Sequence, residues 1–252
     1  MNPVYPIGVM DSGVGGVFVL RQLTRLLPHE RFVFYGDQGN APYGSRDTGE
    51  IQRLTMAAAR ALLDRQIKCL VVACNTATAA AIVLLRQELA IPVVGTEPAL
   101  KPALRAFPDG PVAVMATPST AASEKFRRLR EGMTGEVRVL PCPGLATLVE
   151  NSGPNAPERL AYLAGLFGDF RPRAVVLGCT HYSSLKEELR AVLGEVAVFD
   201  GADGVARQTR RVLRERGLLR AEGPGSVELL SSGGEETLAR LRDFWERTAG
   251  LA

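Results

Sequence analysis

The chain has 252 residues, of which 46% are hydrophobic and 23% charged, and its formal net charge is only +3. This composition is ordinary for a soluble globular protein, and the scattered Lys and Arg residues form no basic stripe that would predict a nucleic-acid partner. No apolar run approaches the roughly 20 residues that span a bilayer, Met1–Met10 lacks a signal-peptide pattern, and the four cysteines lack the spacing of a disulfide framework. We therefore expect a cytoplasmic protein with no nucleic-acid partner and no membrane anchor.

Short apolar runs alternate with longer amphipathic stretches along almost the whole chain. The apolar runs predict strands at Ile7–Met10, Arg31–Tyr35, Cys69–Ala73, Pro92–Gly95, Val112–Ala116, Val137–Leu140, Ala174–Leu177, Val196–Phe199 and Val227–Leu230. The amphipathic stretches predict helices at Val17–Leu27, Gly49–Arg65, Thr76–Leu89, Ser119–Arg130, Pro157–Phe167, Ser184–Leu193, Asp203–Arg216 and Glu236–Arg247. Strands that alternate with helices favour parallel sheets, and such sheets carry their ligand sites at the carboxyl ends of the strands.

Two of the apolar runs lead into a cysteine that is followed by polar residues. Cys74 precedes Asn75 and Thr76, and Cys179 precedes a Thr-His pair. The two cysteines are 105 positions apart (179 minus 74), which suggests two halves that each contribute one thiol to a shared cleft. Thiols on opposite sides of a substrate can remove a proton from a stereocentre and return one.

This duplication predicts an α/β fold of two pseudo-symmetric lobes, each a mainly parallel sheet flanked by helices, with the active site between them. Residues 1–97 form the first lobe in this prediction and residues 98–208 the second. Residues 209–252 then return to the first lobe.

Cys74 opens an alanine-rich helix, with Asn75 or Thr76 as its cap. The positive end of the helix dipole lowers a thiol pKa, so we expect thiolate character at this position. Taken alone, Cys74 is better interpreted as a buried inert thiol. His181 changes that balance, because it lies two positions beyond Cys179 and can share a proton with a thiol or a substrate. Zinc is an alternative use of these residue types, but no CxxC pair supports a metal site.

The first strand leads into Asp11–Gly16, whose three glycines leave backbone N–H groups free to face a ligand. A nucleotide loop is the rival interpretation, but the stretch contains Gly-x-Gly-Gly and lacks the dinucleotide fingerprint. The carboxylate of Asp11 would also repel a phosphate. A carboxylate and hydroxyl pair at the end of a strand, Asp11 with Ser12, is the better interpretation.

Two further loops are candidates for substrate binding. Pro42–Ser45 offers backbone N–H groups and hydroxyls to a carboxylate, or it is simply a turn. Thr117 and Thr120 lie at a strand-to-helix junction, where they either cap the helix or contact an oxyanion. Cys69 and Cys142 have no polar partner nearby in the sequence, and we interpret both as structural.

Four motifs occur in a specific order. They are Asp11-Ser12-Gly13-Val14-Gly15-Gly16, Pro42-Tyr43-Gly44, Ala73-Cys74-Asn75-Thr76-Ala77 and Gly178-Cys179-Thr180-His181-Tyr182. Together they closely resemble the glutamate racemases, of the cofactor-independent Asp/Glu racemase superfamily, and the likeness extends along essentially the whole chain. Two departures are visible: Ser183 stands where the family usually has proline, and Ala116–Thr120 lacks the glycine that is usual there.

The resemblance implies that the chain interconverts L- and D-glutamate and supplies the D-isomer for peptidoglycan. It implies a homodimer that uses no cofactor, in particular no pyridoxal phosphate. The cysteine matching Cys74 acts on D-glutamate and the one matching Cys179 on L-glutamate, while Asp11 and His181 assist and Glu150 is a further acidic residue near the site. The implied substrate contacts are Asp11, Ser12, Tyr43, Gly44, Asn75, Thr76, Thr117, Thr120, Thr180 and His181.

Two other functions are compatible with these residues. A racemase of the same superfamily for aspartate or a related acid is one, because the sequence gives no distance between the thiols and the site of the side-chain carboxylate. A non-catalytic amino-acid-binding regulator is the other. Such a protein would not need a thiol at both strand ends, and this argument favours the enzyme.

Overall fold

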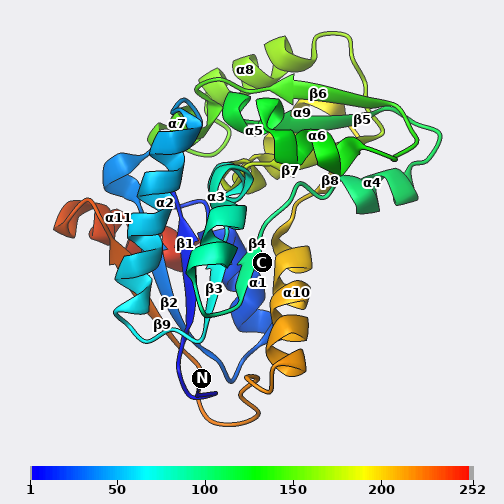
Figure 1. Ribbon diagram of the computed structural model, residues 1–252. Helices are drawn as coiled ribbons and strands as arrows, with labels where there is room; N and C mark the ends of the chain where they lie inside the picture. The colour runs from blue at the N-terminus through cyan, green and yellow to red at the C-terminus, as the bar shows by residue number, and fades with distance from the viewer. Residues whose placement is uncertain (1, 250–252) are drawn as a thin grey trace.

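All strand pairings in the part of the chain that the structure describes are parallel, and they build two sheets (Figure 1). The structure is a computed structural model that describes residues 2–249. The first sheet has the order β4-β3-β1-β2-β9, with β1 (Ile7–Asp11), β2 (Arg31–Gly36), β3 (Cys69–Val72), β4 (Val93–Gly95) and β9 (Ser226–Ser231). The second has the order β6-β5-β7-β8, with β5 (Val112–Ala116), β6 (Val137–Pro141), β7 (Ala174–Gly178) and β8 (Ala197–Phe199). The predicted α/β class is confirmed.

Helices cover both faces of each sheet. The helices near the first sheet are α1 (Val17–Leu26), α2 (Thr48–Leu63), α3 (Asn75–Glu88), α10 (Ala202–Glu215) and α11 (Glu235–Arg247), with the short 3-10 helix η1 (Gln38–Asn40). Those near the second are α4 (Leu100–Ala106), α5 (Pro118–Ala122), α6 (Glu124–Arg130), α7 (Leu145–Asn151), α8 (Pro157–Phe167) and α9 (Lys186–Leu193), with the 3-10 helix η2 (Thr180–Leu185). Among residues 2–249, no helix has the length and apolar character needed to cross a membrane.

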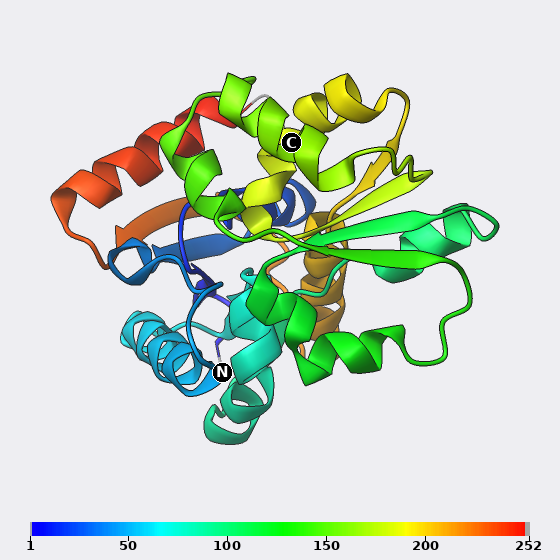
Figure 2. The same cartoon turned by 90° about the horizontal axis from the view of Figure 1, so that it is seen from above.

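Each sheet lies between two hydrophobic cores. On the first sheet, α1, α10 and α11 share one core and α2 with α3 the other. On the second sheet, α7, α8 and α9 share one core and α4 with α6 the other. Seen from above, α11 (red) runs alongside β9 (orange), which it contacts (Figure 2). Strands buried on both faces are continuous apolar runs, and this is why the sequence predicts them well.

The chain passes from one sheet to the other after β4 and returns after β8 (Figure 1). The two crossings touch, because a Cβ added at Gly201 would lie 2.9 Å from the carbonyl oxygen of Glu97. After the second crossing, α10 packs against α1 of the first sheet. The predicted boundary between residues 208 and 209 lies inside α10, and we propose that the second lobe spans residues 98–200 instead. Residues 1 and 250–252 of the predicted first lobe lie outside the described residues.

The predicted strands agree with the structure to within one residue at each end, whereas the helices differ in two respects. The single helix predicted over Ser119–Arg130 is wrong, because α5 and α6 are separated by Ser123 in an extended conformation. The Ser123 hydroxyl donates to the carbonyl of Thr120 at 2.7 Å and accepts the N–H of Phe126 at 3.1 Å. It thereby ends one helix and caps the next. The short helices α4 and α7 were not predicted.

A buried ion pair joins the segments that precede β2 and β3, the two strands on either side of β1 in the first sheet. Lys68, just before β3, pairs with Glu30, just before β2, and the two side chains are 0% and 1% exposed. The Glu30 carboxylate also accepts the backbone N–H of Arg220 at 2.9 Å, in the segment that leads to β9. One carboxylate and one ammonium group thus tie together three separate parts of the chain at this end of the sheet.

Removing one partner of this pair leaves the other charge buried and unpaired. We expect Lys68→Met to lower the free energy of unfolding by about 3–5 kcal/mol, measured by urea denaturation. The matched control is Lys125→Met, because the Lys125–Glu97 pair is 28% and 47% exposed and should contribute only about 0–1 kcal/mol. Equal losses in the two variants would contradict this account.

Candidate active site

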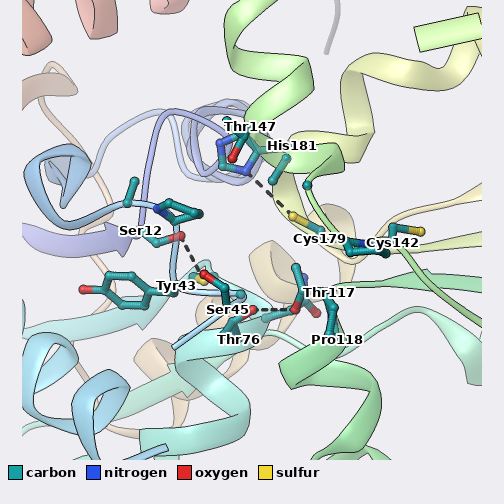
Figure 3. A pocket seen from close by; sticks show the side chains of 18 of the residues that line it. Ser12, Tyr43, Ser45, Thr76, Thr117, Pro118, Cys142, Thr147, Cys179 and His181 are labelled. Atoms are coloured by element: carbon teal, nitrogen blue, oxygen red, sulfur yellow. Dashed lines mark hydrogen bonds between the residues drawn. The ribbon is translucent and has the colours of Figure 1, made fainter. Parts of the chain in front are cut away.

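One cavity of about 270 Å³ lies between the two sheets, at the carboxyl ends of their strands (Figure 3). Its volume lies just below the range of about 300–1,000 Å³ that is typical of pockets for drug-sized ligands, as suits a small substrate. The lining residues are Ser12, Ala41, Pro42, Tyr43, Gly44, Ser45, Cys74, Asn75, Thr76, Thr117, Pro118, Cys142, Pro143, Gly144, Ala146, Thr147, Glu150, Cys179 and His181.

Most of the residues expected at the site line this cavity. Asp11, Thr120 and Thr180 do not line it. Thr120 is hydrogen-bonded to the lining residue Thr76, and the hydroxyl of Thr180 is hydrogen-bonded to the carboxylate of Asp11. Two lining residues with a thiol or hydroxyl group were not expected at the site. Cys142 was expected to be only structural, yet it follows β6 as Cys179 follows β7, and that shared position was the available signal. Thr147 lies three positions before Glu150 on the unpredicted helix α7.

Cys74 itself caps α3, rather than Asn75 or Thr76. Its sulfur accepts the N–H of Ala77 at 3.4 Å and lies 3.4 Å from the hydroxyl of Ser12. The expected low pKa is wrong for this environment. Burial raises the pKa of the Cys74 thiol to about 12, and the nearby Asp11 adds to the effect, which outweighs the hydrogen bonds from Ser12 and Ala77. Cys74 is therefore a protonated thiol at neutral pH.

Cys179 has a different neighbourhood, in which a histidine links it to a carboxylate. Nδ1 of His181 lies 3.7 Å from the sulfur of Cys179, and Nε2 lies 2.6 Å from Oε1 of Glu150. Burial opposes charge on the imidazole, but these two partners outweigh it and hold the pKa of His181 well above its usual value of 6.5. Burial likewise opposes charge on Glu150, yet His181 keeps the pKa of that carboxyl below its usual value. Cys179, His181 and Glu150 form a relay that can store and pass a proton.

The glycine loop Asp11–Gly16 packs against His181 and Glu150, and its glycines permit this close approach rather than anion binding. A Cβ at Gly15 would lie 2.6 Å from the backbone nitrogen of His181, and one at Gly13 would lie 2.5 Å from Oε1 of Glu150. The N–H of Gly13 is bonded to the loop's own Asp11 carboxylate at 3.0 Å. The expectation that these glycines expose N–H groups to a ligand is therefore wrong for Gly13, and the loop is where the two lobes meet.

Asp11 lies at the end of β1 and is fully buried. Its carboxylate accepts the hydroxyl of Thr180, from the second lobe, at 3.1 Å. Burial raises the pKa of Asp11, although the charge of His181 and the N–H of Gly13 oppose that shift. In its ionised form this carboxyl places negative charge close to both Cys74 and His181.

Three threonine hydroxyls form a cluster across the lobes. Thr76 Oγ1 lies 2.9 Å from that of Thr117 and 3.1 Å from that of Thr120. Thr117 also caps α5 by accepting the N–H of Thr120. Beside this cluster, Oδ1 of Asn75 is buried and has no hydrogen-bond partner among the described residues. Since buried polar atoms are normally paired, Asn75 is an acceptor ready for a ligand N–H group.

Tyr43 is held in the cavity wall by Asp37, a residue that the sequence analysis did not single out. The Tyr43 hydroxyl donates to Oδ2 of Asp37, whose Oδ1 accepts the Asn40 amide at 2.9 Å. Burial, with the hydrogen bond to Asp37, raises the pKa of Tyr43 far above its usual value. Tyr43 therefore stays neutral, and Gly44 beside it passes close to the side chain of Thr117.

Comparison with known proteins agrees with this geometry. The sequence profile of the Asp/Glu/Hydantoin racemase family matches residues 7–209. The glutamate racemase of Clostridium acetobutylicum is 42% identical over 234 residues, which cover 90% of this chain and 91% of that protein. The crystal structure of glutamate racemase from Thermus thermophilus in complex with β-chloro-D-alanine is similar with a TM-score of 0.82 and 37% identity, covering 97% of this chain and 94% of that one.

A second crystal structure, of glutamate racemase from Francisella tularensis in complex with D-glutamate, is similar with a TM-score of 0.83 and 26% identity, covering 98% of this chain and 95% of that one. The likeness thus includes both lobes. The chain therefore belongs to the Asp/Glu/Hydantoin racemase family, and it is an amino-acid racemase, an isomerase.

Proposed function

We propose that this racemase interconverts L- and D-glutamate by a two-thiol mechanism, with Cys74 and Cys179 on opposite sides of Cα. The observation that carries the proposal is that a strand of each lobe leads directly into a cysteine, Cys74 or Cys179, and that both thiols line a single small cavity, which Cys142 of the second lobe also lines. The relatives named above are glutamate racemases, and one of them binds D-glutamate, which supports glutamate as the substrate. The resemblance also supports a supply role in peptidoglycan synthesis, a cytoplasmic location and a homodimer.

The two thiols have different neighbours, which suit them to different roles. Burial keeps Cys74 protonated, so it serves as the proton donor, while Cys179 beside the His181–Glu150 pair serves as the base. In this state Cys179 removes the Cα proton of L-glutamate, and Cys74 delivers a proton to the opposite face. The reverse reaction needs the opposite assignment, so the thiols and His181 titrate as one coupled system.

The polar groups around the thiols suit the rest of an amino acid. The Asn75 Oδ1 atom can accept from the substrate ammonium group. Hydroxyls of the Thr76–Thr117–Thr120 cluster can donate to a carboxylate, and so stabilise the charge that develops on it when Cα loses its proton. The neutral Tyr43 and the backbone of Gly44 and Ser45 line the same cavity, with Gly44 close to Thr117, and they suit the second carboxylate of the substrate.

The first prediction concerns the reaction itself. Purified protein without added cofactor should replace the Cα proton of D-glutamate by deuterium in heavy water and form L-glutamate, as followed by NMR and chiral chromatography. Cys74→Ser and Cys179→Ser should each lower racemisation by at least about 100-fold, as expected for loss of a positioned acid or base.

The single variants also separate the two sides of the reaction. Cys179→Ser retains Cys74 and should exchange the Cα proton of D-glutamate faster than it forms L-glutamate. Cys74→Ser retains Cys179 and should exchange the Cα proton of L-glutamate faster than it forms D-glutamate. A folded wild-type protein that neither exchanges nor racemises glutamate would refute the proposed substrate. Full activity in both variants would refute the proposed thiols.

The second prediction concerns pH. Because Glu150 helps to hold the pKa of His181 above its usual value while burial opposes it, Glu150→Gln should lower that pKa. NMR titration of the imidazole signals measures the change, and His29→Gln assigns them. The conversion of D- to L-glutamate loses rate at high pH, because the Cys179–His181 pair must hold the proton that it delivers to Cα. In Glu150→Gln this loss should begin at a lower pH. An unchanged His181 titration would show that the contact with Glu150 is not formed in solution.

The third prediction concerns the meeting of the lobes. Gly15→Ala would place a methyl group 2.6 Å from the backbone of His181 and 2.7 Å from the Thr180 hydroxyl, so it should displace His181 and lower kcat by about 100-fold. The control is Gly204→Ala in α10, where an added Cβ meets nothing within 4 Å and activity should not change. Wild-type kcat in Gly15→Ala would show that the lobes do not need this close approach.

A further inference from the structure

A second buried ion pair lies behind the Glu150–His181 contact. Arg159, in the first turn of α8, and Glu188, in the first turn of α9, have side chains that are 4% and 2% exposed, and Nη1 of Arg159 lies 3.3 Å from Oε1 of Glu188. None of the substrate contacts discussed above involves this pair, and it does not line the cavity. Buried charges are costly unless they are paired and hydrogen-bonded, so the arrangement around them is informative.

The guanidinium group of Arg159 holds the end of α7, the helix that carries Glu150. Nη2 donates to the carbonyl of Val149 at 2.5 Å and to the carbonyl of Ser152. Nε donates to the Ser152 hydroxyl at 2.8 Å, and that hydroxyl itself donates to the carbonyl of Leu148. A helix of seven residues has few bonds of its own, and its last carbonyls need partners. Arg159 supplies those partners on either side of Glu150.

Glu188 anchors the other side of the arrangement. Its Oε1 accepts the N–H of Asn155 at 3.0 Å, and Asn155 is held at a φ of 58°, in the left-handed region. Glu188 also belongs to α9, which continues directly from the 3-10 helix η2 that carries His181. The Arg159–Glu188 pair therefore connects the helix bearing Glu150 to the segment bearing His181.

We propose that Arg159 is a positioning residue for the reaction, which fixes the end of α7 against η2 and α9 and so sets the contact between the carboxylate of Glu150 and the imidazole of His181. This inference rests on the proposed two-thiol function, in which the Glu150–His181 pair serves Cys179. Because Arg159 reaches only the Cys179 side, its loss slows the proton transfer at Cys179 and leaves the transfer at Cys74 intact.

The test uses Arg159→Lys in the full chain. The equilibrium constant of a racemisation is one, so kcat/KM must fall equally in both directions, here by about 10- to 100-fold as for a small misplacement of a catalytic group. The isotope effects then distinguish the two sides. With 2-deuterated L-glutamate the effect on kcat/KM should rise, because Cys179 removes that deuteron; with 2-deuterated D-glutamate it should fall.

A second readout does not depend on turnover. Imidazole titration by NMR should show a lower pKa for His181 in Arg159→Lys, because the bond to Glu150 is weakened. Ser152→Ala removes one contact of Arg159, together with the bond from that hydroxyl to the carbonyl of Leu148, and it should shift both readouts in the same direction by a smaller amount. If Arg159→Lys does not fold, Ser152→Ala tests whether Arg159 positions Glu150 against His181. Lys68→Met is the matched control, since it breaks a buried ion pair in the other sheet and should lower stability alone.

Variants that melt at lower temperature but keep wild-type isotope effects and a wild-type His181 titration would overturn the proposal, since Arg159 would then act only on stability. Failure of the wild-type protein to racemise glutamate would instead overturn the proposed function. The imidazole titration would still decide whether Arg159 sets the contact between Glu150 and His181.

Discussion

The carboxyl ends of two parallel sheets face one cavity, and the rest of the structure depends on this arrangement. Inversion at a carbon atom needs an acid and a base on opposite sides, and one sheet edge presents its groups from one side only. Here β3 leads to Cys74 and β7 leads to Cys179, so each sheet provides one side. The crossings after β4 and β8 and the loop around Gly13 and Gly15 keep the two edges at a fixed separation.

The two buried thiols have different neighbours. Around Cys74 only weak donors, Ser12 and the N–H of Ala77, oppose the cost of a buried charge. Around Cys179 an imidazole backed by a carboxylate offers a full positive charge. In the proposed mechanism, two groups of the same chemistry acquire distinct roles through their surroundings, which is the general way in which one site provides both an acid and a base.

The sequence predicts those parts of the fold and the site that depend on local pattern. All nine strands follow from apolar runs, and Cys74 and Cys179 stand out because polar residues follow them directly. Contacts between distant segments could be predicted only from the family resemblance, or not at all. Glu150, for example, contacts His181, which is 31 positions away, and it lies on a helix that is too short to show a periodicity. The pKa of Cys74 was predicted in the wrong direction, because the helix dipole is visible in the sequence whereas the depth of burial is not. The glycines of Asp11–Gly16 were misinterpreted for the same reason, since the sequence does not show what packs against them.

The order of strands in the first sheet has a consequence for synthesis of the chain. Strand β9, which pairs with β2, and helices α10 and α11, which complete one of its cores, all follow the second sheet in the sequence. During translation the first sheet therefore has α1 alone on one face and β2 as an edge strand until the ribosome has made the whole of the second sheet. The inserted lobe is continuous, and domains generally fold as units. The second lobe is thus the first that can finish folding, although it begins later in the chain.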